Sequence, residues 1–245
     1  RVPFYAAALV TFLNLIYGYF ILPESLKKEN RREFEWSRAN PLGALFALKR
    51  YPSVAGLIGA LTFIYLASHA VQGTWAYFSM EKFNWSESMV GYSLGLVGIM
   101  SALVQGLLIR LIIPKIGEYK TMIAGIIFNI CGCLLFSMAS EGWMLLCFII
   151  PYSLGGIAGP AIQGILSNQI PPNEQGQLQG ALTSMMAATG IIGPLMMTSI
   201  FAYFTAADAP IYFPGAPFVT GAILVLICLF LIIRKGSKYT TGNRI

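Results

Sequence analysis

Seven long apolar segments alternate with short polar ones along the chain. They cover residues 3–22, 54–79, 90–113, 121–139, 143–166, 181–205 and 218–233. The hydrocarbon core of a bilayer is about 30 Å thick, and about 20 apolar residues of helix span it. Helices are expected because every backbone N–H and C=O in lipid must find its partner within its own segment. The pattern predicts an all-α, polytopic membrane protein with seven transmembrane helices.

Composition and charge support this prediction and add an orientation. The chain is 56% hydrophobic and only 11% charged, which excludes an ordinary soluble domain. When the spans alternate across a membrane, all of the 16 Lys and Arg except Arg1 and Lys82 lie on one face or at its edge. The positive-inside rule makes that face, and the C-terminus with it, cytoplasmic. The net charge of +6 therefore describes orientation in a cell membrane rather than binding to nucleic acid.

The longest polar interval, residues 23–53, is the best candidate for a boundary. It carries seven basic and four acidic residues, too much charge to enter lipid. Asn40 and Pro41 within it are typical of a helix start, so we expect a short helix on the membrane surface. We expect a helical bundle over residues 54–233 and a cytoplasmic tail over 234–245. Because the chain opens with Arg1 directly before a span, we also expect it to be part of a longer protein.

Four side-chain amides lie inside predicted spans, each on a different helix. They are Gln72, Gln105, Asn129 and Gln163. Long hydrogen-bonding side chains pack poorly in lipid and usually face a neighbouring helix or a water-filled cavity. The set predicts a shared polar cavity for a small-molecule substrate, although pairs between helices would also satisfy these amides.

Other residues on the same helix faces extend this candidate site. The remaining cavity candidates are His69, Trp75, Ser101 and Tyr152. Small or helix-bending residues are candidates for close packing and gating, namely Gly98, Gly156, Pro160, Gly190, Gly193 and Pro194. His69 is the only histidine, and it is consistent either with a proton carrier or with a neutral residue between helices.

Catalytic and metal chemistry are not expected. No Asp, Glu or Lys lies in the middle of any predicted span. The four cysteines all fall inside spans and are interpreted as small buried residues without a metal or a disulfide framework. We therefore expect no cofactor and no enzyme, since an intramembrane enzyme needs a nucleophile and a base, or metal ligands, facing one another.

Several short motifs resemble the tetracycline-resistance efflux proteins, which are drug:proton antiporters of the major facilitator superfamily. The motifs run in the same order and spacing through residues 67–194. They are Gly91-Tyr92-Ser93-Leu94, Gln105, Lys115-Ile116-Gly117-Glu118, Ser140-Glu141-Gly142-Trp143, Gly155-Gly156-Ile157-Ala158, Pro160-Ala161-Ile162-Gln163-Gly164, Gln175-Gly176-Gln177-Leu178-Gln179-Gly180 and Ala188-Thr189-Gly190-Ile191-Ile192-Gly193-Pro194.

This resemblance implies a protein of twelve spans in two six-helix halves. Residues 1–22 would then be its sixth helix, residues 23–53 its central cytoplasmic loop, and residues 54–233 its C-terminal half. The resemblance also implies protons as the coupling ion and a bacterial inner membrane as the location. The missing N-terminal half would be a partner of the part present here.

The chain departs from that family at three positions. Ser101 and Asn129 stand where the tetracycline exporters carry a histidine and an aspartate that are tied to drug and proton handling. Pro114 stands where the loop after the eighth helix is expected to carry an aspartate. The resemblance therefore does not carry tetracycline specificity, or a proton step at these positions, over to this chain.

The sequence favours part of a secondary active transporter that exports a small amphipathic or drug-like molecule. A seven-helix receptor or sensor is the alternative, since the span count permits it. Against a receptor, no lysine lies in the middle of a span to hold retinal, and no cysteine pair lies on the outer face.

Overall fold

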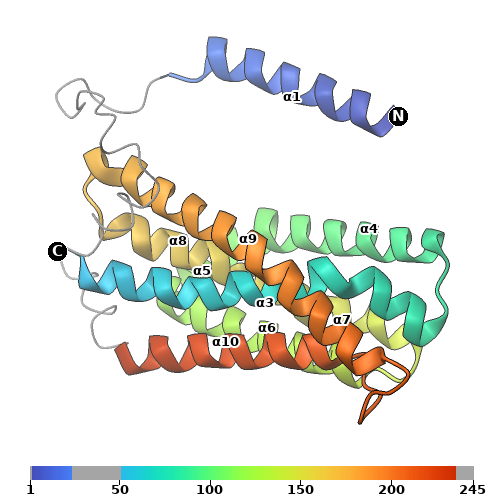
Figure 1. Ribbon diagram of the computed structural model, residues 1–245. Helices are drawn as coiled ribbons and strands as arrows, with labels where there is room; N and C mark the ends of the chain where they lie inside the picture. Colours follow the sequence, from blue (N-terminus) through green and yellow to red (C-terminus); the bar gives the residue numbers. More distant parts are fainter. Residues whose placement is uncertain (1, 24–50, 236–245) are drawn as a thin grey trace. The chain divides into compact units, whose positions relative to one another are not determined.

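A computed structural model describes residues 2–23 and 51–235 of the chain. It divides the chain into two compact units, residues 1–35 and 36–245. The described part of the first unit is a single apolar helix, α1 (Val2–Ile21), which contains no charged residue (Figure 1). The surface helix predicted at Asn40 and most of the tail predicted over 234–245 lie outside the described residues.

The second unit is built from helices alone over its described residues, 51–235 (Figure 1). They are α3 (Pro52–Phe83), α4 (Glu87–Leu103), η4 (Val104–Leu108), α5 (Ile109–Ile116), α6 (Glu118–Met138), α7 (Gly142–Leu154), η5 (Gly155–Ile157), α8 (Ala158–Asn168), η6 (Pro172–Glu174), α9 (Gln175–Thr205) and α10 (Ala216–Lys235). With α1 they give seven helical segments that are long and apolar enough to cross a membrane, which confirms the predicted number.

The helices extend a few residues beyond the apolar segments, and local signals explain where they end. Asn84 closes α3 in a left-handed conformation, with φ of 52°, and its backbone N–H is donated to carbonyls of the last turn. The Ser86 hydroxyl accepts a hydrogen bond from the Met89 N–H and caps the start of α4. Gly117, with φ of 80°, separates α5 from α6, and only glycine adopts this conformation without strain.

Two of the spans are not continuous α-helices. The third span contains a π-helical stretch, η4, and the fifth contains a 3₁₀ turn, η5. Pro160 was predicted to bend the fifth span, and the 3₁₀ turn lies directly before it. Because proline has no N–H for the carbonyl of Gly156, regular α-helical bonding cannot continue through this point. The two irregular stretches contact each other.

Helix α3 packs against α10 and α9, while α6 packs against α10, α7 and α8. The largest core side chains near one end are aromatic, with the Trp75 ring 5.0 Å from Phe136 and the Phe78 ring 4.8 Å from Phe218. Close approach elsewhere depends on glycine. A Cβ at Gly132 would lie 2.6 Å from the Cα of Tyr152, so α6 and α7 meet there backbone to backbone.

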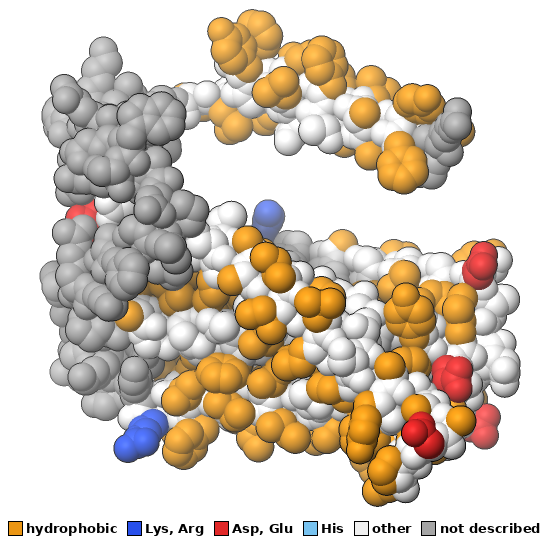
Figure 2. Space-filling view, in the orientation of Figure 1, with side chains coloured by type: hydrophobic (Ala, Val, Ile, Leu, Met, Phe, Trp, Pro, Cys, Tyr) orange, Lys and Arg blue, Asp and Glu red, His pale blue; other side chains and the backbone are white. Residues whose placement is uncertain are grey.

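Acidic and basic residues are unevenly divided between the two ends of the second unit. Four of the six described carboxylates lie in the turns at one end: Glu81, Glu87, Glu141 and Asp208. Figure 2 shows most of the red atoms gathered at one end. The Tyr212 hydroxyl at this end donates to Glu81 Oε1 at 2.9 Å, and partial desolvation together with this carboxylate raises the pKa of Tyr212. The other end carries most of the described basic residues: Arg110, Lys115, Lys120, Arg234 and Lys235.

Candidate functional site

The three glutamines of the predicted site lie on the exposed surface of the second unit. Gln72 is on α3, Gln105 in η4 and Gln163 on α8. None of the three amides hydrogen-bonds to another residue within the described ranges. An amide exposed to hydrocarbon loses its hydrogen bonds to water at a cost of several kcal/mol. These side chains are therefore expected to face water or another polar surface rather than lipid.

Gln105 is brought together with a second predicted residue, Gly156. The Gln105 Nε2 atom lies 3.6 Å from the point that a Cβ at Gly156 would occupy. This contact joins η4 to η5, the two stretches where the helical hydrogen-bond pattern changes. Stretches of this kind often occur at functional sites, because they leave backbone carbonyls without their usual helical partners.

Asn129 lies behind this junction on α6 and is half-buried. Its backbone lies 2.9 Å from where a Cβ at Gly155 would be, so α6 and η5 are in close contact. The Cys133 thiol donates to its Oδ1 over 3.8 Å. Asn129 is therefore partly engaged within its own helix, unlike the three exposed glutamines.

His69 and Gly193 meet where α3 crosses α9. The ring of His69 occupies the space that any side chain at position 193 would need, with its Cγ 2.6 Å from an added Cβ. One turn along, Pro194 Cα lies 3.9 Å from an added Cβ at Gly73. Two of the predicted packing residues, Gly193 and Pro194, thus lie at this crossing, and His69 is partly exposed beside it.

Trp75 lies in the core of the second unit. Only 2% of its surface is exposed, and its indole N–H donates to the Ser93 hydroxyl at 2.9 Å. Its ring packs against Phe136 and Phe218 in the core. Trp75 was expected beside a cavity because it neighbours the polar face of α3, but its partners on α6 and α10 hold it inside the bundle.

Tyr152 lies at the contact between α7 and α6 and is only partly exposed. Its backbone packs against Gly132, and its ring centroid lies 5.2 Å from that of Phe136. Tyr152 therefore serves the packing of these two helices in the second unit and is not beside the three exposed glutamines in any described contact.

The remaining predicted residues are partly or fully exposed on the second unit. Ser101 on α4 is partly exposed, and Pro160 on α8 follows η5. A Cβ added at Gly98 or Gly190 would meet nothing within 4 Å. Gly98 and Gly190 are exposed on the second unit, so their predicted role in helix packing stays a prediction.

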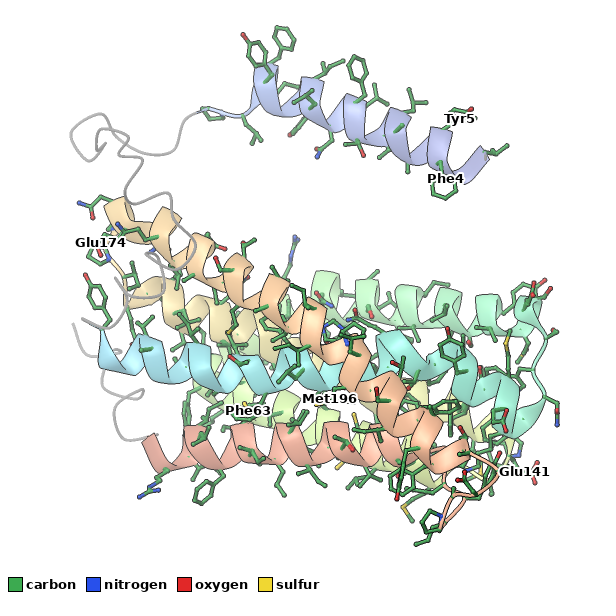
Figure 3. The ribbon with its side chains drawn as sticks, in the orientation of Figure 1. Phe4, Tyr5, Phe63, Glu141, Glu174 and Met196 are labelled. Carbon is green, nitrogen blue, oxygen red and sulfur yellow. The ribbon has the colours of Figure 1, made fainter. Side chains whose placement is uncertain are left out.

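A set of polar contacts that was not predicted from the sequence lies at the end where α9 begins. The Tyr51 hydroxyl donates to Glu174 Oε2 at 3.1 Å, and only 4% of Glu174 is exposed. Figure 3 shows Glu174 at this end of the bundle and Glu141 at the opposite end. Nearby, the Asn168 amide donates to both Glu118 oxygens at 3.3 and 3.4 Å. The one sequence signal was a carboxylate directly before a helix, where it stabilises the N-terminus.

The described part of the site offers groups that form hydrogen bonds. No group of three or more His, Cys, Asp or Glu residues that could hold a metal occurs in the described ranges. What these ranges offer is amide donors and acceptors and hydroxyl groups along helices that could span a membrane. Such groups can bind a polar or amphipathic molecule through hydrogen bonds.

Comparison with known proteins places these features in a family. The chain matches the family model of the Major Facilitator Superfamily over residues 1–194 and again over residues 60–244. Tetracycline resistance protein, class C, of Escherichia coli is 35% identical over 235 residues, which is 96% of this chain and 58% of that protein. Tetracycline resistance protein, class H, of Pasteurella multocida is 30% identical over 244 residues, 98% of this chain and 59% of that protein.

A solved structure agrees with this match at the level of the fold. The human organic anion transporter MFSD10 has a TM-score of 0.76 with this chain at 24% identity. The alignment covers 91% of this chain and 55% of MFSD10. The chain thus spans less than two thirds of the length of the proteins that it matches.

Proposed function

The chain belongs to the Major Facilitator Superfamily, and from this we propose that it forms part of a proton-coupled exporter of a small amphipathic or drug-like molecule. The observation that carries the proposal is the similarity to tetracycline resistance proteins over almost the whole chain. Drug efflux and antibiotic resistance follow from the same similarity. The seven-helix receptor is not favoured, because the family match and the similar proteins indicate a transporter.

The exposed glutamines support a substrate pathway along this part of the protein. Gln72, Gln105 and Gln163 would contribute hydrogen-bonding groups to a polar surface at membrane depth, with Ser101 and Asn129 beside them. In transporters of this kind the substrate binds near the middle of the membrane, between two halves of the protein. We propose that the second half of the surface comes from an N-terminal bundle not contained in this chain.

The orientation is also part of the proposal. The end that carries Arg110, Lys115 and Arg234 would be cytoplasmic, since basic residues near span ends are retained on that side. The carboxylate-rich end with Glu81 and Glu141 would face outward. In a bacterium the protein would then lie in the inner membrane with its C-terminus in the cytoplasm.

Reconstitution of the intact transporter into liposomes tests the proposal. Uptake of tetracycline and of the amphipathic cation ethidium is measured with the lumen acidic, so that protons leaving drive substrate entry. We expect uptake of at least one compound, and a weaker apparent affinity in Gln105→Ala and Gln163→Ala with the fold retained. Tyr77→Phe, which removes one hydroxyl from an exposed ring on α3, is the control. Uptake unaffected by both glutamine variants would contradict the proposed pathway.

A further inference from the structure

We infer that His69 is the residue that carries the proton in this part of the transporter, at the crossing of α3 and α9. This inference rests on the proposed function and assigns one of its steps to a single side chain. The tetracycline-exporter resemblance does not provide this assignment, because the two positions that it links to protons are Ser101 and Asn129 here.

The His69 ring lies at a position suited to this role. His69 lies far from both ends of α3, 12 residues or about 18 Å before Glu81. Its ring touches the α9 backbone at Gly193, yet the residue remains partly exposed. Among the described contacts neither ring nitrogen has a hydrogen-bond partner.

The described helices around the His69 ring carry no charged residue in their middle turns. Helix α9 carries no Asp, Glu, Lys or Arg between Gln175 and Thr205, and α8 carries none either. The charged residues of α3, α4 and α10 all lie in end turns: Glu81, Lys82, Glu87, Arg234 and Lys235. The other titratable groups on these helices are Tyr65, Tyr77, Tyr92, Tyr203 and Cys228, and none of them is a carboxylic acid or an amine.

These surroundings make the charge of the ring depend on what covers it. With no described carboxylate to pair with, an imidazolium at His69 is stable only while water or an anion reaches its exposed side. When substrate or another part of the protein covers that side, the neutral form is favoured. Protonation thereby becomes linked to the opening and closing of the helical face, which a residue of fixed charge could not achieve.

The step balances with protons alone. A ring nitrogen accepts a proton from water on the outer side, forming one N–H bond and an imidazolium. After the face opens to the cytoplasm, the same N–H bond breaks and the proton passes to water there. On the outer side an O–H bond of hydronium breaks as the N–H bond forms, and in the cytoplasm an O–H bond forms on water as the N–H bond breaks, so no oxidant or reductant is needed. The contact with Gly193 would let movement of α9 over α3 change the exposure of the ring.

The test separates proton coupling from substrate binding in the intact transporter. Wild type, His69→Gln and the control Tyr77→Phe are reconstituted, with tetracycline and ethidium as substrates. Two rates are measured, uptake driven by an acidic lumen and substrate exchange without a pH gradient. We expect His69→Gln to lose gradient-driven uptake by at least about tenfold while exchange stays within about twofold of wild type. His69→Asn replaces His69→Gln if the latter does not fold.

Each outcome has a distinct meaning. Loss of driven uptake with exchange retained supports the assignment. Normal driven uptake with an unchanged pH profile in the variant overturns it, and so does loss of both rates in a folded variant, which indicates substrate binding instead. Wild-type protein that exchanges substrate without any response to a pH gradient overturns the proposed proton coupling itself, and the assignment with it.

Discussion

Gly193→Ala is predicted to destabilise the protein because the helix crossing leaves no room for a Cβ. An added Cβ would lie 2.6 Å from Cγ and 3.0 Å from Cβ of His69. These atoms are next to the α3 backbone, so rotating the end of the histidine side chain cannot relieve the clash. Either the ring must change its χ1 rotamer or the two helices must separate.

The expected magnitude follows from two opposing effects. Overpacking a close contact costs about 1–3 kcal/mol. Replacing glycine by alanine inside a helix returns up to about 1 kcal/mol. With the full helix gain, the net loss is up to about 2 kcal/mol, which corresponds to a fall in melting temperature of up to about 8 °C for a protein of this size.

Thermal unfolding of the detergent-solubilised protein measures this effect. Gly59→Ala on α3 is the matched control, since an added Cβ there meets nothing within 4 Å and should leave the melting temperature unchanged or raise it. A double-mutant cycle identifies the cause, because Gly193→Ala should cost little once His69→Ala has removed the ring. If Gly193→Ala is equally costly with and without the ring, the clash with His69 is not the reason.

Two further predictions concern packing and the polar end. Gly132→Ala should prevent stable packing of α6 against α7, because its Cβ would meet the Tyr152 backbone. Gly159→Ala is the control, since its Cβ would meet nothing within 4 Å. The yield of monodisperse protein in detergent is compared for the two variants, and equal yields would refute the close contact. Tyr51→Phe should lower the free energy of unfolding by about 1.5–3 kcal/mol, because buried Glu174 loses a donor. An unchanged melting temperature would show that this hydrogen bond does not stabilise the fold.

The sequence predicts the spans well because hydropathy is a local property of about 20 residues. Hydropathy predicts the ends of the spans less well. Helix α3, for example, continues through the charged residues Glu81 and Lys82 before Asn84 closes it. The π-helical and 3₁₀ stretches depend on hydrogen-bond register, which a hydropathy pattern does not encode. Only Pro160 gave a local signal for one of them.

The candidate site is harder to predict because it depends on which helices are neighbours. Gly98 and Gly132 are both glycines on helix faces, yet Gly132 meets Tyr152 and Gly98 meets nothing in the second unit. The sequence around Trp75 does not show that it is buried. Its burial depends on Phe136 and Phe218, which are far away in the sequence and pack against its ring. The three exposed glutamines could be identified from the sequence alone, because a side-chain amide within an apolar segment needs no knowledge of the neighbouring helices to be recognised.

Simultaneous measurement of substrate and proton movement tests whether this protein is part of a proton-coupled exporter. The intact transporter is reconstituted into liposomes with an acidic lumen, and ethidium uptake is followed together with the pH of the lumen. We expect ethidium to accumulate against its concentration gradient while the lumen becomes more alkaline, and we expect collapse of the pH gradient to stop both. Uptake that continues at the same rate without a pH gradient, or with no proton movement, would contradict this coupling.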